Sequence, residues 1–128
     1  MADVRDLMNT KVVSTTAETS VRDAAKAMTE AKVGSAIVMQ GAWLNGILTE
    51  RDVLRAVASG EDLGTSPVSK WMTPDPESAS PSMSVDDAAQ TMLLHGFRHL
   101  PVVEGNEVRG VVSIRDLLAA RIRRPKRR

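Results

Sequence analysis

Two short segments of the chain place a hydroxyl, a guanidinium and a carboxylate close together. Residues 49–52 read Thr-Glu-Arg-Asp, and residues 113–116 read Ser-Ile-Arg-Asp. Hydroxyls and free backbone N–H groups at a helix start attract anions such as phosphate. A carboxylate can accept from two vicinal hydroxyls, in charge-assisted bonds of roughly 1.5–3 kcal/mol each. These groups therefore match the phosphate and the ribose of a nucleotide.

The same two segments are also helix-capping sequences. T-x-x-D and S-x-x-D are typical of capping boxes, in which the hydroxyl and the acid bond to backbone N–H groups. Plain caps of this kind are predicted at Ser20 with Asp23 and at Ser84 with Asp87, without a preceding glycine-led strand. Both interpretations stay open at the two junctions, and their duplicated context favours a ligand.

The segments recur because the chain contains one unit twice. Residues 4–57 align with residues 68–121 without a gap, and Gly46 falls on Gly110. In each copy, apolar residues at i, i+3, i+4 and i+7 predict an amphipathic helix, and two short strands and a second helix follow. The predicted fold class is α+β, with α/β character, as two pseudo-symmetric βαββα repeats. The predicted strands are about 35–40, 43–48, 100–104 and 107–112, and the predicted second helices are 50–58 and 114–123.

The predicted organisation has four parts. A segment rich in Gly, Ser and Pro separates the two copies and predicts a linker. The predicted parts are repeat 1 at 1–60, the linker at 61–67, repeat 2 at 68–121 and a basic C-terminal tail at 122–128.

Composition narrows the function. The chain has no cysteine, which excludes disulfides, thiolate zinc sites and a cysteine nucleophile. It has no apolar run long enough for a membrane span and no apolar core of a signal peptide, so we expect a cytoplasmic protein. No phosphate-loop lysine motif, nucleophile elbow or dinucleotide glycine motif occurs. We therefore expect a protein that is not an enzyme.

Two histidines and a basic tail are further candidates. His95 and His99 are four residues apart, but Gly96 interrupts the helix between them and no third ligand accompanies them, so no metal site is predicted. His99 is a candidate phosphate donor or an ordinary surface histidine. Residues 121–128 hold six of the 17 basic side chains and no acid. Such a tail is either solvated or a salt-sensitive contact to nucleic acid or an acidic partner.

The duplicated G-h-h-[ST]-x-R-D-h-h segment at the end of a βαββα unit resembles the tandem cystathionine-β-synthase (CBS) domain pair, or Bateman module. The resemblance covers about residues 4–121. The segment Gly96-Phe97-Arg98-His99-Leu100-Pro101-Val102-Val103 adds to it, because many members carry a basic pair before Leu-Pro-Val.

The resemblance implies a regulatory module that binds AMP, ADP, ATP or S-adenosylmethionine in two clefts between the repeats. It also implies a homodimer formed through the helices. Carried over, cleft one uses Thr49, Arg51 and Asp52 with Arg98 and His99, near Ser78. Cleft two uses Ser113, Arg115 and Asp116 with Gly34, Ser35 and Ala36, near Ser14 and Thr15.

The second cleft departs from the family pattern, because copy one lacks the basic pair and the proline. We therefore expect cleft one to favour phosphate-rich ligands and cleft two to be weaker, empty or suited to a less charged adenosyl group. Two alternatives to a sensor remain: a dimerisation scaffold with vestigial clefts, and a nucleic-acid-associated protein acting through its tail. The sequence names neither the adenosyl ligand nor an effector protein.

Overall fold

The computed structural model describes residues 2–123, which form two compact units. Residues 11–76 make one unit, named here the first-repeat unit. Residues 2–10 together with residues 77–123 make the second-repeat unit. The α+β class with two repeats, predicted from the sequence, is confirmed.

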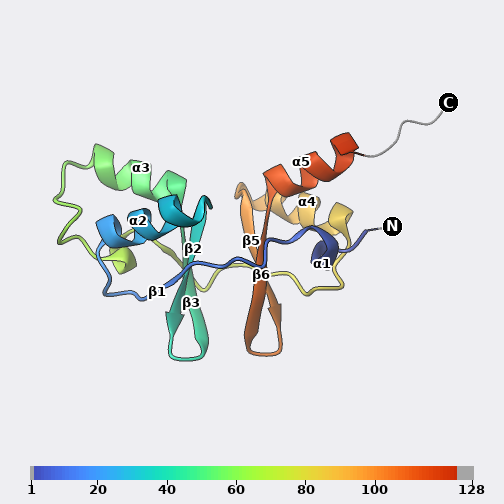
Figure 1. The fold of residues 1–128 in the computed structure, drawn as a ribbon, viewed down its shortest axis with the longest axis horizontal. Coiled ribbons are helices and arrows are strands. Elements are labelled where there is room, and N and C mark those ends of the chain that lie inside the picture. The colour runs from blue at the N-terminus through green and yellow to red at the C-terminus, as the bar shows by residue number, and fades with distance from the viewer. Residues whose placement is uncertain (1, 124–128) are drawn as a thin grey trace. The chain divides into compact units, whose positions relative to one another are not determined.

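The first-repeat unit is a four-stranded sheet with two helices (Figure 1). The strand order is β1-β2-β3-β4, with β1 parallel to β2 and the other pairs antiparallel. In chain order the elements are β1 (Ser14–Thr15), α2 (Val21–Ala31), β2 (Ser35–Gln40), β3 (Trp43–Thr49), α3 (Glu50–Ala58), the 3-10 turn η1 (Val68–Lys70) and β4 (Thr73–Pro74).

The second-repeat unit repeats this plan around the antiparallel hairpin β5–β6 (Figure 1). Single bridges stand where the first-repeat unit has short strands: Ala79 pairs with Val102 in parallel, and Asn9 pairs with Val111 antiparallel. The elements are α1 (Val4–Leu7), α4 (Val85–His95), β5 (His99–Glu104), β6 (Glu107–Ser113) and α5 (Ile114–Arg123).

Local sequence signals set the element boundaries. Ser20 Oγ accepts from the Asp23 N–H at 3.1 Å and begins α2, and Ser84 begins α4 in the same way. The hairpin turns use Gly41 and Gly105, whose φ values of +61° and +63° suit glycine. Predicted caps and turns are confirmed at these positions.

Each unit has its own aliphatic core, built around one cross-strand pair. In the first-repeat unit, Ala36 of β2 faces Leu48 of β3, and both side chains are fully buried. In the second-repeat unit, Leu100 of β5 faces Val112 of β6, again fully buried. The leucine of the pair thus lies on the second strand of the hairpin in the first-repeat unit and on the first strand in the second-repeat unit. The two cores are therefore similar but are filled by different side chains.

The opening segment of each repeat packs in the other repeat's unit. Val4 of α1 is fully buried in the core of the second-repeat unit, where its N–H donates to Met83 O at 2.8 Å. Val68 of η1 is fully buried in the core of the first-repeat unit. The sequence repeats and the compact units therefore differ by exchange of these segments, an exchange that no sequence pattern predicts.

The paired glycines Gly46 and Gly110 make room for the exchanged segments. A Cβ on Gly46 would lie 2.8 Å from Thr73 O, and one on Gly110 would lie 2.8 Å from Asn9 O. Gly46→Ala and Gly110→Ala are each expected to lower the free energy of unfolding by about 1–3 kcal/mol, because a backbone atom must shift. Urea denaturation followed by circular dichroism measures this, and a loss below about 0.5 kcal/mol would contradict the steric explanation.

Two sequence-based expectations concern the basic C-terminal tail and membrane-spanning helices. Of the predicted basic tail at residues 122–128, residues 122–123 belong to α5, and residues 124–128 lie outside the described residues. Within residues 2–123, no helix has the length and apolar character to cross a membrane.

Candidate functional site

The two hydroxyl–acid segments occupy equivalent positions in their units. Thr49 ends β3 and precedes α3, and Ser113 ends β6 and precedes α5. In the first-repeat unit, the Glu50 N–H donates to Gly34 O at 3.0 Å. In the second-repeat unit, the Ile114 N–H donates to Arg98 O at 2.9 Å. Each helix therefore starts against the first strand of its own hairpin.

Both acids close the start of their own helix. Asp52 Oδ2 accepts from the Thr49 N–H at 2.9 Å, and the Asp52 N–H donates to Thr49 Oγ1 at 3.4 Å. Asp116 Oδ2 accepts from the Ser113 N–H at 2.8 Å, and the Asp116 N–H donates to Ser113 Oγ at 3.1 Å. The capping interpretation of the two segments is thus confirmed, and any ligand role must coexist with it.

Asp52 is the more enclosed of the two acids. Its side chain is 9% exposed, and Thr49 Oγ1 adds a second hydrogen bond to Oδ2 at 3.0 Å. Arg55, one turn further along α3, donates from its guanidinium to Oδ1 at 2.8 Å. Both carboxylate oxygens of Asp52 therefore already have partners.

Asp116 lacks the equivalent ion pair. The residue three positions after it is Ala119, where the first repeat has Arg55. Asp116 is half-buried, whereas Asp52 is buried. The two junctions thus share a motif but differ in what surrounds the acid.

The structure brings together, within each unit, residues that the resemblance divides between two clefts. Ser35 lies opposite Thr49 in the β2–β3 register, and His99 lies opposite Ser113 in the β5–β6 register. The pairing of Thr49 with His99, or of Ser113 with Ser35, joins different units and stays a prediction.

The remaining predicted site residues differ in accessibility. Arg51, Arg98 and Arg115 are exposed, and so are Ser14 of β1 and Ser78 beside the Ala79 bridge. Gly34, Thr15 and His99 are partly buried. Ser35 is 5% exposed, and the Ala36 side chain lies in the core. Ala36 therefore has only backbone atoms to offer a ligand.

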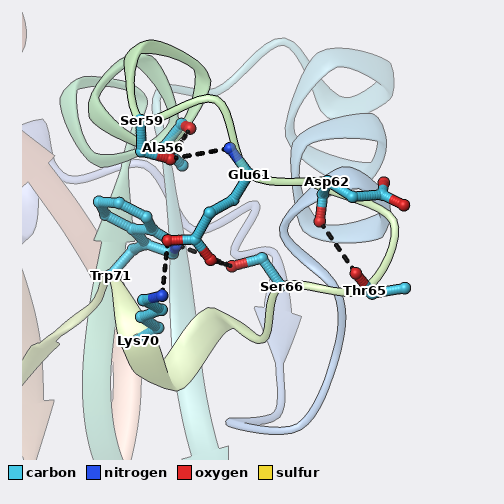
Figure 2. A network of polar contacts seen from close by, with 8 residues as sticks. All are labelled: Ala56, Ser59, Glu61, Asp62, Thr65, Ser66, Lys70 and Trp71. Atoms are coloured by element: carbon cyan, nitrogen blue, oxygen red, sulfur yellow. Dashed lines mark hydrogen bonds and ion pairs between the residues drawn. The ribbon is translucent and has the colours of Figure 1, made fainter.

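A polar network around Trp71 was not foreseen from the sequence (Figure 2). Trp71 Nε1 donates to the buried Ser66 Oγ at 2.9 Å, and the Glu61 carboxylate lies between Ser66 and the Lys70 ammonium. The Arg55 guanidinium lies 5.6 Å from the Trp71 ring centroid, within the range of a cation–π interaction. Four of these residues come from the segment after α3, whose position depends on the exchange of η1.

The two histidines lie on different elements. His95 stacks on Phe97 with ring centroids 5.4 Å apart, and His99 lies on β5. Among residues 2–123 there is no group of three or more His, Cys, Asp or Glu side chains that could hold a metal ion.

Known proteins share this arrangement. The family model of the CBS domain matches residues 4–59 and again residues 68–123. The CBS domain-containing protein YhcV of Bacillus subtilis is 39% identical over 118 residues, which are 91% of this chain and 84% of that protein. A structure of a protein with CBS domains from Burkholderia ambifaria has a TM-score of 0.90 at 30% identity, covering 99% of this chain and 98% of that one. The CBS domain protein PAE2072 from Pyrobaculum aerophilum, complexed with AMP, has a TM-score of 0.82 at 31% identity, covering 90% of this chain and 89% of that one.

The duplicated hairpin, its two helices and its capped strand-to-helix junctions define a tandem pair of βαββα domains. The chain belongs to the CBS domain family and contains two copies of the CBS domain.

Proposed function

We propose that this CBS pair is a non-catalytic regulatory module that binds an adenosine-containing ligand. The observation that carries the proposal is the recurrence, at both strand-to-helix junctions, of a hydroxyl, an exposed arginine and an acid at the first turn of a helix. A structural neighbour that covers nine-tenths of this chain is complexed with AMP, which supports an adenosine ligand.

In this proposal each group of the junction has one role. The Ser113 hydroxyl and the Arg115 guanidinium meet phosphate oxygens, because the backbone N–H groups of Ser113, Ile114 and Asp116 already have partners within the unit. Asp116 accepts from the ribose hydroxyls. Thr49, Arg51 and Asp52 have the corresponding roles in the first repeat. The clefts between the repeats predicted from the family resemblance, with Ser14, Thr15, Gly34, Ser35, Ala36, Ser78, Arg98 and His99 as further contributors, belong to the same proposal.

A cap and a ribose site are compatible at Asp116. An ionised carboxylate has two oxygens and about four lone-pair positions. The bond from the Ser113 N–H uses one position on Oδ2. The helix cap therefore fixes the carboxylate in place and leaves acceptor capacity for a diol.

Isothermal titration with AMP, ADP, ATP and S-adenosylmethionine tests the proposal. Saturable binding of an adenosine compound, with no binding of inorganic phosphate alone at the same concentration, is the expected result. Absence of heat for all four compounds at millimolar concentration would overturn the proposal and leave the dimerisation scaffold as the better explanation.

The proposal includes a homodimer formed through helices. Large exposed apolar side chains concentrate on three helices, and exposed apolar groups of this kind mark interaction surfaces. They are Leu54 and Val57 of α3, Leu93 and Leu94 of α4, and Leu118 and Ile122 of α5.

Leu94→Glu is expected to convert the dimer to a monomer, because a charge replaces a side chain that is 75% exposed in the single chain. Light scattering after size-exclusion chromatography gives the mass. Trp43→Ser is the control, because Trp43 is 66% exposed at the start of β3 and belongs to none of these three helices. A monomeric wild-type protein, or a dimer unaffected by Leu94→Glu, would contradict an interface that includes this face of α4.

A further inference from the structure

One position separates two junctions that otherwise share the same motif. Three residues after the acid, α3 has Arg55, whereas α5 has Ala119. Both acids cap their helices through Oδ2 in the same way. Asp52 additionally accepts from the Thr49 hydroxyl and is the more enclosed acid, and it binds a cation three residues further along its helix, where α5 has alanine.

The cation beside Asp52 is well placed to hold it. A guanidinium nitrogen of Arg55 lies 2.8 Å from Asp52 Oδ1, and the Asp52 side chain is 9% exposed. The Arg55 side chain is 56% exposed, so water screens this bond less than a pair with two exposed partners and more than a fully buried one.

The Arg55 guanidinium also lies over the Trp71 ring, 5.6 Å from its centroid. The indole is fixed by the bond from Nε1 to Ser66 Oγ, and the Lys70 ammonium lies 5.8 Å from the ring centroid (Figure 2). Arg55 thus bridges the acid and an anchored aromatic ring, both within the first-repeat unit.

We propose that Arg55 occupies the Asp52 carboxylate, so that a ribose must displace Arg55 before it can bind to Asp52. The inference rests on the function proposed above and concerns the regulation of the same sites. The two vicinal hydroxyls of a ribose need the carboxylate oxygen that Arg55 already uses. The Asp116 site has alanine at the position equivalent to Arg55, so a cation three residues after the acid does not compete with a ribose there.

The consequence is that the two sites differ in affinity and fill in a fixed order. A ligand fills the Asp116 site first, and fills the Asp52 site at a concentration up to about tenfold higher, the factor that corresponds to one displaced charge-assisted bond. This order departs from the sequence-based expectation that the first cleft is the stronger one.

Two substitutions test the proposal by isothermal titration with AMP and ATP. One removes the cation at position 55, and the other adds a cation at position 119. Arg55→Gln keeps the side-chain stem and a donor but removes the charge, and it is expected to strengthen the weaker site up to about tenfold. Ala119→Arg places a cation three residues after Asp116 and is expected to weaken the stronger site by a similar factor. Arg22→Gln, which removes an exposed ion pair with Asp62 in the same unit, is the matched control and leaves both affinities unchanged.

A spectroscopic readout reports on Arg55 itself. In a Trp43→Phe background, Trp71 is the only tryptophan of the chain. Its emission is expected to change with occupation of the weaker site, because Arg55 then leaves Asp52 and its position over the ring alters. The Arg55→Gln protein should not show this change.

The outcomes separate the two proposals. No binding to the wild type, to Arg55→Gln or to Ala119→Arg at millimolar ligand would overturn the proposed function and this inference with it. Binding with affinities that neither substitution moves would overturn the role of Arg55 alone. Thermal melting of each variant without ligand identifies any that fails to fold, in which case Arg55→Met, which also lacks the charge, and Ala119→Lys take their places.

Discussion

Replacement of Leu48 by alanine is expected to lower the free energy of unfolding by about 2–5 kcal/mol. Leu48 is fully buried and faces Ala36 across the β2–β3 ladder, so the substitution leaves two alanines opposite one another. The core around them is aliphatic and close-packed, and a cavity there removes dispersion contacts as well as buried area. A loss of this size is a large fraction of the stability of a small domain.

Denaturation with two probes measures the effect. Both tryptophans, Trp43 and Trp71, belong to the first-repeat unit, so their fluorescence reports its unfolding, while circular dichroism reports the helices of both units. Leu48→Met is the control and should cost less than about 1.5 kcal/mol, because it conserves volume.

A rescue variant uses the second core as its template. The double variant Ala36→Leu with Leu48→Val copies the Leu100–Val112 pair and should recover part of the loss. A Leu48→Ala protein with unchanged stability would show that the pair does not fill the core as described.

Asp116→Asn is expected to weaken adenosine-ligand affinity about 10- to 100-fold, because charge-assisted bonds of about 1.5–3 kcal/mol become weaker neutral ones. The substitution separates the two roles of the side chain. Asparagine keeps a carbonyl oxygen that can accept from the Ser113 N–H, so the cap at the start of α5 is retained. Binding is measured by isothermal titration and the cap by thermal melting without ligand.

The control for this experiment is a second helix-capping acid in the same unit. Asp87 follows the cap residue Ser84 at the third position of α4, as Asp116 follows Ser113, but no strand-to-helix junction of a hairpin leads into it. Asp87→Asn should leave affinity unchanged. Equal affinities of wild type and Asp116→Asn would reduce Asp116 to a structural cap.

The candidate site shows why one motif predicted two things at once. A Ser or Thr followed by an acid three residues later satisfies backbone N–H groups at a helix start, and the same groups suit phosphate and ribose. At Thr49 and Asp52 the capping bonds form within four consecutive residues, so the sequence contains all the information needed for them. Whether the acid has capacity for a ligand depends on other neighbours, and no local pattern reports those.

The sequence by itself determined the repeat, the capped helices, the two hairpins and the turns at Gly41 and Gly105. These features rest on side-chain periodicity and on bonds between residues a few positions apart, which act wherever the segment lies in the molecule. The tertiary structure alone decided that Val4 and Val68 exchange cores, that Gly46 and Gly110 must be glycine, and that Trp71 meets Arg55 beside Asp52. Those outcomes depend on which distant segment fills a given space, and close packing of side chains far apart in the chain settles that.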